Sequence, residues 1–331
     1  MKKILLLFFF SLFLLSGCGK YDEKDVIKDF SKKVNDTDAY YIEGKLEIVN
    51  NDNIYNYDIE VAFKQEKYYR VSLTNISNNH TQVILKNDDG VYVVTPSLNK
   101  SFKFQSDWPY SNSQIYLLES LVQDIKDDDD RIFKETKSGY SFMTSVNYPN
   151  NRNLVKQKIN LSKKLKLEKV QVYNSDSVIC MTMEYKKIDY SPNFKKDYFS
   201  LNTVMKTYAV DDTVDQTSVL DESIYPLMIP SGTKLTNEEK IDKGTGERII
   251  MTFDGEKPFL LVEETANIEN EFTIVPTYGE PYQLMDTLGV MTNNSLNWTT
   301  NGIEYYLVSD VLNQDELVEV AQSIGVVQTM K

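Results

Sequence analysis

Apolar and polar residues alternate with a period of two over most of the first two-thirds of the chain. In the clearest run, Tyr57, Ile59 and Val61 are separated by Asp58 and Glu60. Such alternation predicts a strand with one buried face. Comparable runs occupy 39–48, 55–63, 69–74, 82–86, 91–95, 101–105, 140–146, 154–161, 165–173 and 178–186. Turn-forming segments such as 87–90 separate them, so the pattern predicts about eleven strands before residue 190, in an antiparallel meander.

Two segments of this region repeat instead with the period of a helix. One predicted helix covers 22–35 and the other covers 112–126, with Asn112 or Ser113 as its cap. Their apolar stripes are Val26, Ile27, Phe30 and Val34, and then Ile115, Leu118, Leu121, Val122 and Ile125. The four aspartates at 127–130 lack the spaced ligands of an EF-hand, so we expect a solvated loop there. The polar stretch 187–220 is expected to be an irregular linker.

A second pattern starts near Tyr225. Strands are expected at 248–253, 259–263, 272–275, 296–299 and 303–308, with a tight hairpin turn at Asn301-Gly302. Asn313 and Glu316 have the spacing of a capping box. The helix that follows has Leu317, Val320, Ala321 and Ile324 on its apolar face and Gly325 at its end. The sequence therefore predicts one domain over 39–220 and a small α+β domain with its own core over 221–331.

The N-terminus combines Lys2 and Lys3 with an apolar run over 4–15 and then Leu15-Ser16-Gly17-Cys18. The run is too short to span a bilayer, and the small residues after it suit a peptidase. This order resembles the lipobox of bacterial lipoproteins. The resemblance implies a signal peptide over 1–17, a diacylglyceryl group on Cys18, and a tether and helix over 18–38. Two acyl chains would hold the protein at the extracytoplasmic face of the cell membrane. An ordinary secretory signal with an incidental Cys18 is the alternative.

Composition narrows the classes of partner. The chain carries 36 basic and 49 acidic residues, a formal net charge of −13. Nucleic-acid binding requires a basic surface, so this balance argues against it. Anionic lipid head groups would also repel such a surface, which leaves the acyl chains to hold the protein at the membrane. The abundance of Asn, Lys, Ile and Tyr is typical of a low-GC, Gram-positive bacterium.

No residue pattern indicates catalysis. Gly244-Thr245-Gly246 lacks the third glycine of a phosphate-binding motif, and no Cys/His spacing suits a metal. The single histidine, His80, lies in a polar turn and is expected at the surface. Cys180 lies in an apolar run and is expected to be a small strand residue without a disulfide partner in the mature chain. We therefore expect a protein that is not an enzyme and has no cofactor apart from the lipid on Cys18.

Two sets of residues resemble known families. Residues 87–102 and Asp107-Trp108-Pro109-Tyr110 are similar to the sporulation and germination lipoproteins of the YdcC/GerS-like group, within the LolA-like superfamily. Residues 298–306 and the helix after them are similar to a C-terminal domain of unknown function (DUF4367-like). The first resemblance implies a fold that is mainly β with α (α+β). It would be an incomplete antiparallel half-barrel with lid helices, followed by the small α+β domain.

The resemblance implies two alternative functions. One is a non-catalytic binding or scaffold protein of sporulation or spore germination, with a cortex or other cell-wall amidase as candidate partner. The other is a lipid- or lipoprotein-binding carrier or acceptor that uses the hydrophobic cavity of the half-barrel. Cavity and lid candidates are Tyr57, Ile59, Val61, Phe63, Tyr69, Val71, Leu73, Ile115, Leu118, Leu121 and Val122. These residues suit an ordinary core equally well. A tethered chain cannot shuttle between membranes, which favours the scaffold.

Overall fold

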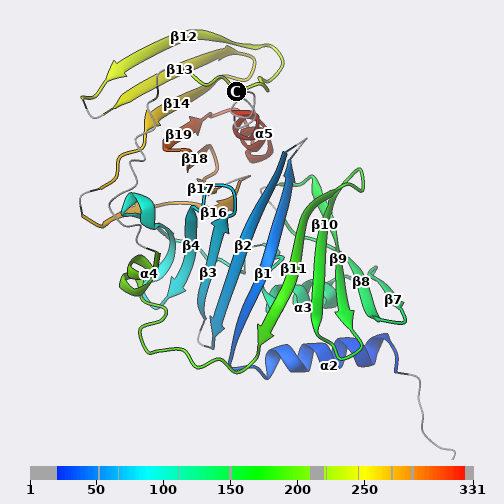
Figure 1. Cartoon of the computed structure of the whole chain (residues 1–331). Coiled ribbons are helices and arrows are strands. Elements are labelled where there is room, and N and C mark those ends of the chain that lie inside the picture. The colour runs from blue at the N-terminus through cyan, green and yellow to red at the C-terminus, as the bar shows by residue number, and fades with distance from the viewer. Residues whose placement is uncertain are drawn as a thin grey trace, which may run out of the picture.

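The computed structural model describes residues 21–50, 53–65, 67–110, 112–148, 151–208, 220, 222–244, 246–269, 271–284 and 287–324. Within these residues the chain forms two open β-sheets and four α-helices (Figure 1). Strands account for most of the regular structure, so the predicted fold class, mainly β with a few helices, is confirmed.

The first sheet has 12 strands in the order β15-β6-β5-β4-β3-β2-β1-β11-β10-β9-β8-β7. The strands before residue 190 are β1 (Ala39–Asn50), β2 (Asn53–Lys64), β3 (Tyr68–Asn75), β4 (Thr81–Asn87), β5 (Gly90–Thr95), β6 (Lys100–Phe104), β7 (Ile132–Glu135), β8 (Gly139–Ser145), β9 (Leu154–Ser162), β10 (Leu167–Asn174) and β11 (Ile179–Asp189). β1 pairs antiparallel with both β2 and β11, so two meanders extend from it in opposite directions. The predicted antiparallel meander is confirmed, and β7 is an addition that the alternation did not predict.

Helix α2 (Glu23–Asn35) crosses one end of this sheet (Figure 1). A capping box starts it: the Asp25 amide donates to Asp22 Oδ1 at 3.1 Å, and the Asp22 amide donates to Asp25 Oδ2 at 3.2 Å. Val26, Phe30 and Val34 are buried on its inner face. The helix predicted over 22–35 is confirmed.

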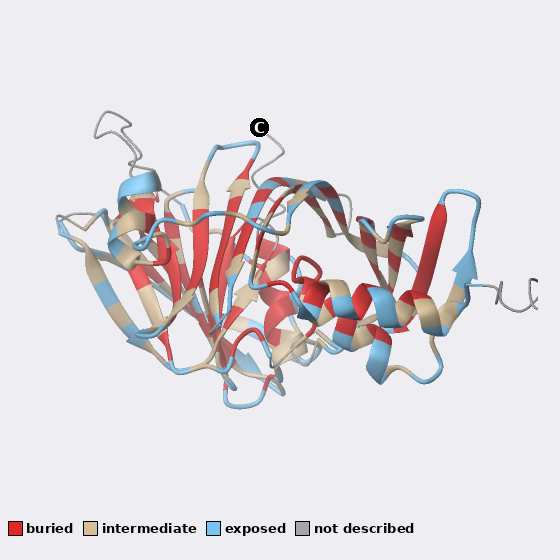
Figure 2. Ribbon diagram, turned by 90° about the horizontal axis from the view of Figure 1, so that it is seen from below, coloured by how far each residue is buried: buried red, intermediate tan, exposed pale blue. Residues whose placement is uncertain are grey.

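Helix α3 (Leu118–Asp127) packs into the same core as α2, on the concave side of the sheet (Figure 2). The predicted start of this helix, at residue 112, is wrong. Ser113 does not cap it, because the Ser113 hydroxyl donates to Asp124 Oδ1 at 3.0 Å and accepts from the Asn147 amide at 2.9 Å. Residues 112–117 therefore form an irregular segment that leads into the helix.

The stretch 187–220 is not wholly irregular, contrary to the prediction. Helix α4 (Leu201–Tyr208) and the segment before it pack on the outer face of the first sheet. Their buried residues Phe199 and Val204 contact a second apolar cluster that includes Leu85 and Tyr92. β4 and β5 are thus buried on both faces, which explains their nearly continuous apolar sequences.

The second sheet has 7 strands in the order β12-β13-β14-β19-β18-β17-β16. Their bounds are β12 (Thr233–Asp242), β13 (Glu247–Gly255), β14 (Phe259–Thr265), β16 (Glu280–Gln283), β17 (Leu288–Met291), β18 (Ser295–Thr300) and β19 (Ile303–Val308). Asn301 and Gly302 both have positive φ, as a type I′ hairpin turn requires. β12, β16 and β17 were not predicted from the sequence.

Helix α5 (Gln314–Ile324) packs against this sheet through Leu317, Val320, Ala321 and Ile324. The predicted capping box is confirmed, because the Glu316 amide donates to Asn313 Oδ1 at 3.0 Å and the Asn313 amide donates to Glu316 Oε2 at 3.1 Å. Gly325, the predicted end of the helix, lies outside the described residues.

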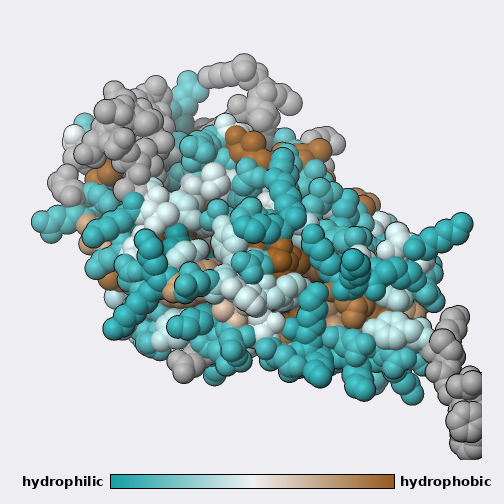
Figure 3. Space-filling view, turned by 60° about the horizontal axis from the view of Figure 1, so that its bottom comes forward, coloured by the Kyte–Doolittle hydropathy of each residue, from teal (hydrophilic) through white to brown (hydrophobic). Residues whose placement is uncertain are grey.

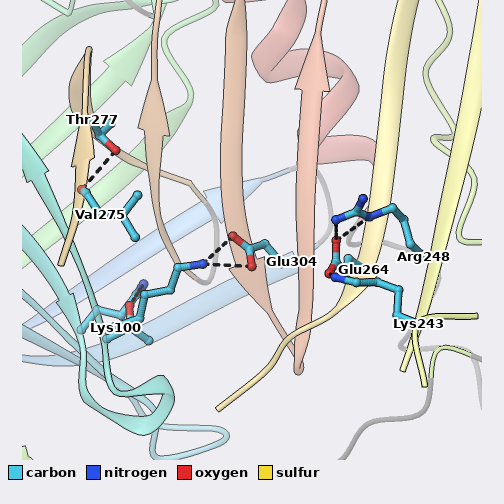
Figure 4. A network of polar contacts seen from close by, with 9 residues as sticks. Lys100, Lys243, Arg248, Glu264, Val275, Thr277 and Glu304 are labelled. Carbon is cyan, nitrogen blue, oxygen red and sulfur yellow. Dashed lines mark hydrogen bonds and ion pairs between the residues drawn. The ribbon is translucent and has the colours of Figure 1, made fainter. Parts of the chain in front are cut away.

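The two sheets are linked by a strand and by polar contacts. β15 (Thr273–Thr277), predicted as a strand of a C-terminal domain with its own core, instead pairs in parallel with β6 and extends the first sheet. Figure 4 shows Lys100 of β6 reaching Glu304 of β19, with Nζ 2.9 Å from Oε1. The buried Gln82 side chain of β4 accepts from the Leu288 amide at 2.6 Å. These contacts hold the second sheet against the first.

Candidate binding groove at the junction of the two sheets

The structure brings the predicted cavity and lid residues together, on β2, β3 and the segment that contains α3. Phe63 is half-buried, and the other ten are buried in one apolar cluster. The members of this cluster from the predicted set are Tyr57, Ile59, Val61, Tyr69, Val71, Leu73, Ile115, Leu118, Leu121 and Val122. α3 therefore fills the concave side of the sheet at these positions.

Two carboxyl groups of α3 are anchored in this region. Glu119 Oε2 accepts from the Tyr40 hydroxyl at 2.7 Å, and burial raises the pKa of Glu119. Asp124 accepts from Ser113 and, at 2.6 Å, from Gln157 Nε2, and burial raises the pKa of Asp124 to about 6. Both acids have specific structural partners, so their geometry indicates that they position α3.

A groove of about 570 Å³ lies between the two sheets, and we refer to it as the junction groove. Its volume is in the range of about 300–1,000 Å³ that is usual for ligand sites. One wall comes from the first sheet, where Ile48 of β1, Ile84 of β4 and Met181 of β11 contribute apolar side chains. Of the eleven predicted cavity and lid residues, Ile115 lines the groove.

The opposite wall comes from the second sheet and α5. Tyr282, Leu284, Leu288 and Val318 line it, and the last three are buried. Trp108, from the irregular segment after β6, closes the space between the walls and is 1% exposed. The groove is therefore apolar at its base. It exists because β4 and β17 lie side by side although they are more than 200 residues apart in the chain.

The rim of the groove is polar and carries negative charge. Amide side chains there include Asn50, Asn112 and Gln322. Among the described lining residues, Asp315 and Glu319 are the ones with a formal charge at neutral pH, and both belong to α5. Residues four apart lie on one face of a helix, so both carboxylates border the same side of the opening.

A curated relative identifies the family. The "Sporulation protein YdcC" of Bacillus subtilis (strain 168) is 36% identical to this chain over 319 residues, which covers 95% of this chain and 94% of the relative. The chain belongs to the YdcC family of sporulation proteins. The predicted resemblance to the YdcC/GerS-like group is thereby confirmed. No family model matches the chain, so the resemblance of the C-terminal part to the DUF4367-like domain stays a prediction.

The solved structures to which the chain is similar have much lower sequence identity. Pseudomonas aeruginosa MucA/MucB is 12% identical, with 90% of this chain and 97% of that chain covered, at a TM-score of 0.32. The structure of the CwlD amidase from Clostridioides difficile in complex with the GerS lipoprotein is 18% identical, with 53% of this chain and 99% of that chain covered, at a TM-score of 0.25. A LolA superfamily protein from Nitrosomonas europaea is 9% identical, with 54% of this chain and 97% of that chain covered, at a TM-score of 0.32. At such TM-scores these proteins do not superpose in detail on the YdcC-family chain.

Cys180 lines the groove and is half-buried. Burial raises the pKa of its thiol, which lowers the fraction of reactive thiolate at neutral pH. The sequence predicted a small strand residue, and the structure places it in β11. Because Cys180 lines the groove, a ligand bound there should change the rate at which its thiol is alkylated.

His80 is more buried than the prediction of a surface residue implied. Its Nδ1 lies 3.2 Å from Ser97 Oγ, and burial lowers the pKa of the imidazole. A neutral ring that bonds a neighbouring hydroxyl fits a structural role in the turn before β4. In the described part of the chain, no group of His, Cys, Asp and Glu side chains is arranged to hold a metal ion.

The predicted lipidation site, Cys18, and the predicted signal peptide, 1–17, lie outside the described residues. No helix within the described ranges is both long and apolar enough to cross a membrane. The surface drawn in Figure 3 is mainly hydrophilic, with apolar atoms gathered in limited areas. The lipidation of Cys18 and the signal peptide over 1–17 therefore remain predictions.

Proposed function

We propose that this YdcC-family chain is a non-catalytic binding protein, anchored at the extracytoplasmic face of the cell membrane through Cys18, that holds a protein partner during sporulation or germination. The junction groove carries this proposal. It has a pocket-sized volume, an apolar base and a polar rim, which is the usual composition of a binding site. Membership of the YdcC family supports the link to sporulation.

The position of the groove supports a partner that is not the anchoring membrane. α2, which follows the predicted anchor, lies near the start of β1, whereas Ile48 lines the groove near the end of β1 (Figure 1). A 12-residue strand spans about 40 Å at ~3.3 Å per residue. The groove therefore lies about one strand length from the anchored end. The cell-wall amidase suggested by the family resemblance is the first candidate partner.

A second candidate function is the binding of an acyl chain, and the apolar base of the groove is the observation that favours it. Two observations weigh against it. α3 occupies the concave side of the first sheet, where a carrier would hold its lipid. The carboxylates of Asp315 and Glu319 at the rim would repel an anionic head group.

Site-specific photo-crosslinking in sporulating cells tests the proposal. A photo-reactive residue in place of Gln322, on the groove side of α5, should capture a discrete protein. The same residue in place of Glu239, an exposed position on β12, serves as the matched control. Native mass spectrometry of the Cys18→Ser chain tests for bound acyl lipid in parallel.

The outcomes separate the two functions. A protein captured from position 322 but not from 239 supports the binding role. Co-purified acyl lipid that is lost on Gln322→Trp supports the carrier instead. The anchor is tested separately, since Cys18→Ser should release the protein from the membrane fraction and abolish labelling with radioactive fatty acid. Retention of Cys18→Ser in the membrane would rule out the lipid anchor.

A further inference from the structure

The junction groove has an uneven charge distribution that limits what it binds. Among its described lining residues, Asp315 and Glu319 carry formal negative charge, and none of them is a lysine, arginine or histidine. A ligand that enters this space therefore meets carboxylates without a competing cation in the lining. We infer that the groove takes an apolar peptide segment that carries a lysine or arginine side chain. This inference rests on the proposed function, because it names the chemistry of the protein partner.

The two carboxylates differ in what they already bind. Asp315 Oδ1 accepts from the backbone amide of Arg152 at 3.1 Å and lies in the first turn of α5, where the positive end of the helix dipole offsets its charge. Glu319 lies one turn further along and is exposed. No ion pair of Glu319 is found in the described ranges, so Glu319 is the stronger partner for an incoming cation.

The neighbouring acid of α5 shows the contrast. Glu316 forms an ion pair with Lys257, in the turn between β13 and β14, and this pair lowers the pKa of the Glu316 carboxyl. It caps the helix and does not line the groove. Of the acids of α5, Glu316 therefore has a structural role, whereas Asp315 and Glu319 line the groove. An exposed ion pair typically changes an equilibrium about two- to fivefold, so Asp315 and Glu319 together provide about tenfold selectivity for a basic over an uncharged side chain.

The base of the groove favours an apolar segment rather than a free polyamine. Ile48, Ile84 and Leu288 form apolar surface there, and burial of apolar area provides most of the free energy of such binding. Gln283 adds a hydrogen-bond acceptor, because its buried Oε1 has no partner in the part of the chain that the structure describes. A peptide N–H is a suitable donor for that oxygen. Selectivity against acidic segments follows from like-charge repulsion at the rim.

Fluorescence anisotropy with two labelled peptides tests the inference. One peptide has four apolar residues followed by two lysines, and the other has two glutamates in their place. The protein is the chain without its predicted signal peptide, with Cys18→Ser. We expect the lysine peptide to bind at least about tenfold more tightly, with a smaller difference at high salt because the rim is exposed to solvent.

Three variants locate the effect. Glu319→Lys should weaken the lysine peptide by about three- to tenfold and tighten the glutamate peptide. Glu239→Lys makes the same charge change on β12, at the opposite edge of the second sheet from β16, and should leave both affinities unchanged. Gln322→Trp should block both peptides by filling the groove. Circular dichroism and urea unfolding confirm that each variant is folded.

Cys180 provides a second readout. Cys18 and Cys180 are the 2 cysteines of the chain, so the Cys18→Ser protein has a single thiol, and that thiol lines the groove. The lysine peptide should slow alkylation of Cys180 in proportion to occupancy, and the slowing should be lost in Gln322→Trp. Acceleration or no change at saturating peptide would place the peptide elsewhere.

The inference is overturned if the two peptides bind equally, if Glu319→Lys behaves like Glu239→Lys, or if the lysine peptide does not bind at about 1 mM, which corresponds to about −4.1 kcal/mol. Its failure is distinct from failure of the proposed function. A protein crosslinked at position 322 in cells, together with equal peptide binding, would retain the binding role and remove its preference for a basic segment.

Discussion

The buried carboxyl of Asp124 should make the protein less stable as the pH rises. Asp124 lies on α3, and burial raises the pKa of its carboxyl from 3.8 to about 6. The native state therefore binds this proton more tightly than the unfolded chain does. The contribution of Asp124 to stability is complete below pH 3.8 and decreases as the pH rises to about 6, above which it is constant.

The magnitude follows from the two pKa values. A rise from 3.8 to about 6 corresponds to about 3 kcal/mol, at 1.36 kcal/mol per pKa unit. About half of this, ~1.4 kcal/mol, is lost between pH 5 and pH 8, because part of the ionisation penalty is already present at pH 5. Asp124→Asn removes the ionisable group, so the stability of the variant relative to the native chain should increase by ~1.4 kcal/mol over this interval.

The asparagine can keep the local hydrogen bonds. Gln157 is fully buried, its Nε2 donates to Asp124 Oδ2 at 2.6 Å, and its Oε1 has no partner among the described residues. Rotation of the Gln157 amide by half a turn lets Oε1 accept from the amide that replaces Oδ2. The Ser113 hydroxyl still donates to the remaining oxygen. The substitution therefore tests ionisation rather than the loss of contacts.

Urea unfolding of both proteins at several pH values between 5 and 8 measures the difference. Asp129→Asn removes an exposed carboxylate just after the same helix and is the control, with a difference that stays within about 0.5 kcal/mol across the range. If Asp124→Asn and the native chain keep a constant difference from pH 5 to pH 8, the raised pKa of Asp124 is refuted.

Three further predictions concern the core, the junction and the second sheet. Leu118→Ala should lower the free energy of unfolding by about 2–5 kcal/mol, because Leu118 is fully buried under the first sheet; a loss below ~1 kcal/mol in urea unfolding would mean that α3 does not fill the concave side. Gln82→Leu should cost about 2–4 kcal/mol and speed amide exchange in β17, since the Leu288 amide and carbonyl both lose their bonds to Gln82; unchanged exchange there would contradict the junction. Glu263→Gln should stabilise the protein above pH 7 by up to about 3 kcal/mol. Burial raises the pKa of the Glu263 carboxyl from 4.5 to about 7, so the native chain loses stability as the pH rises through that value. Equal melting temperatures of variant and native chain at pH 8 would disprove this prediction.

Local patterns were sufficient for most of the secondary structure. A period of two is a property of neighbouring residues, and it predicted most strands of the first sheet from alternations such as that of Tyr57, Ile59 and Val61. Capping is equally local, so the box of Asn313 and Glu316 was predicted with its correct spacing. The same locality misled at Ser113, whose hydroxyl bonds distant residues instead of the helix.

Most strands of the first sheet, the helices that begin with capping boxes, the residues of the main core and the family could be predicted from the amino-acid sequence. The position of the junction groove, in contrast, depends on contacts between distant segments of the chain. β15 pairs in parallel with β6 of the first sheet and not with the strands that flank it in the sequence. α4 covers the outer face of β4, and α5 lies across the groove from Ile48. The physical reason is that hydrophobic burial has no direction along the chain, so the partner that covers an apolar face is chosen by packing in three dimensions. The junction groove is the space that this packing leaves between two sheets.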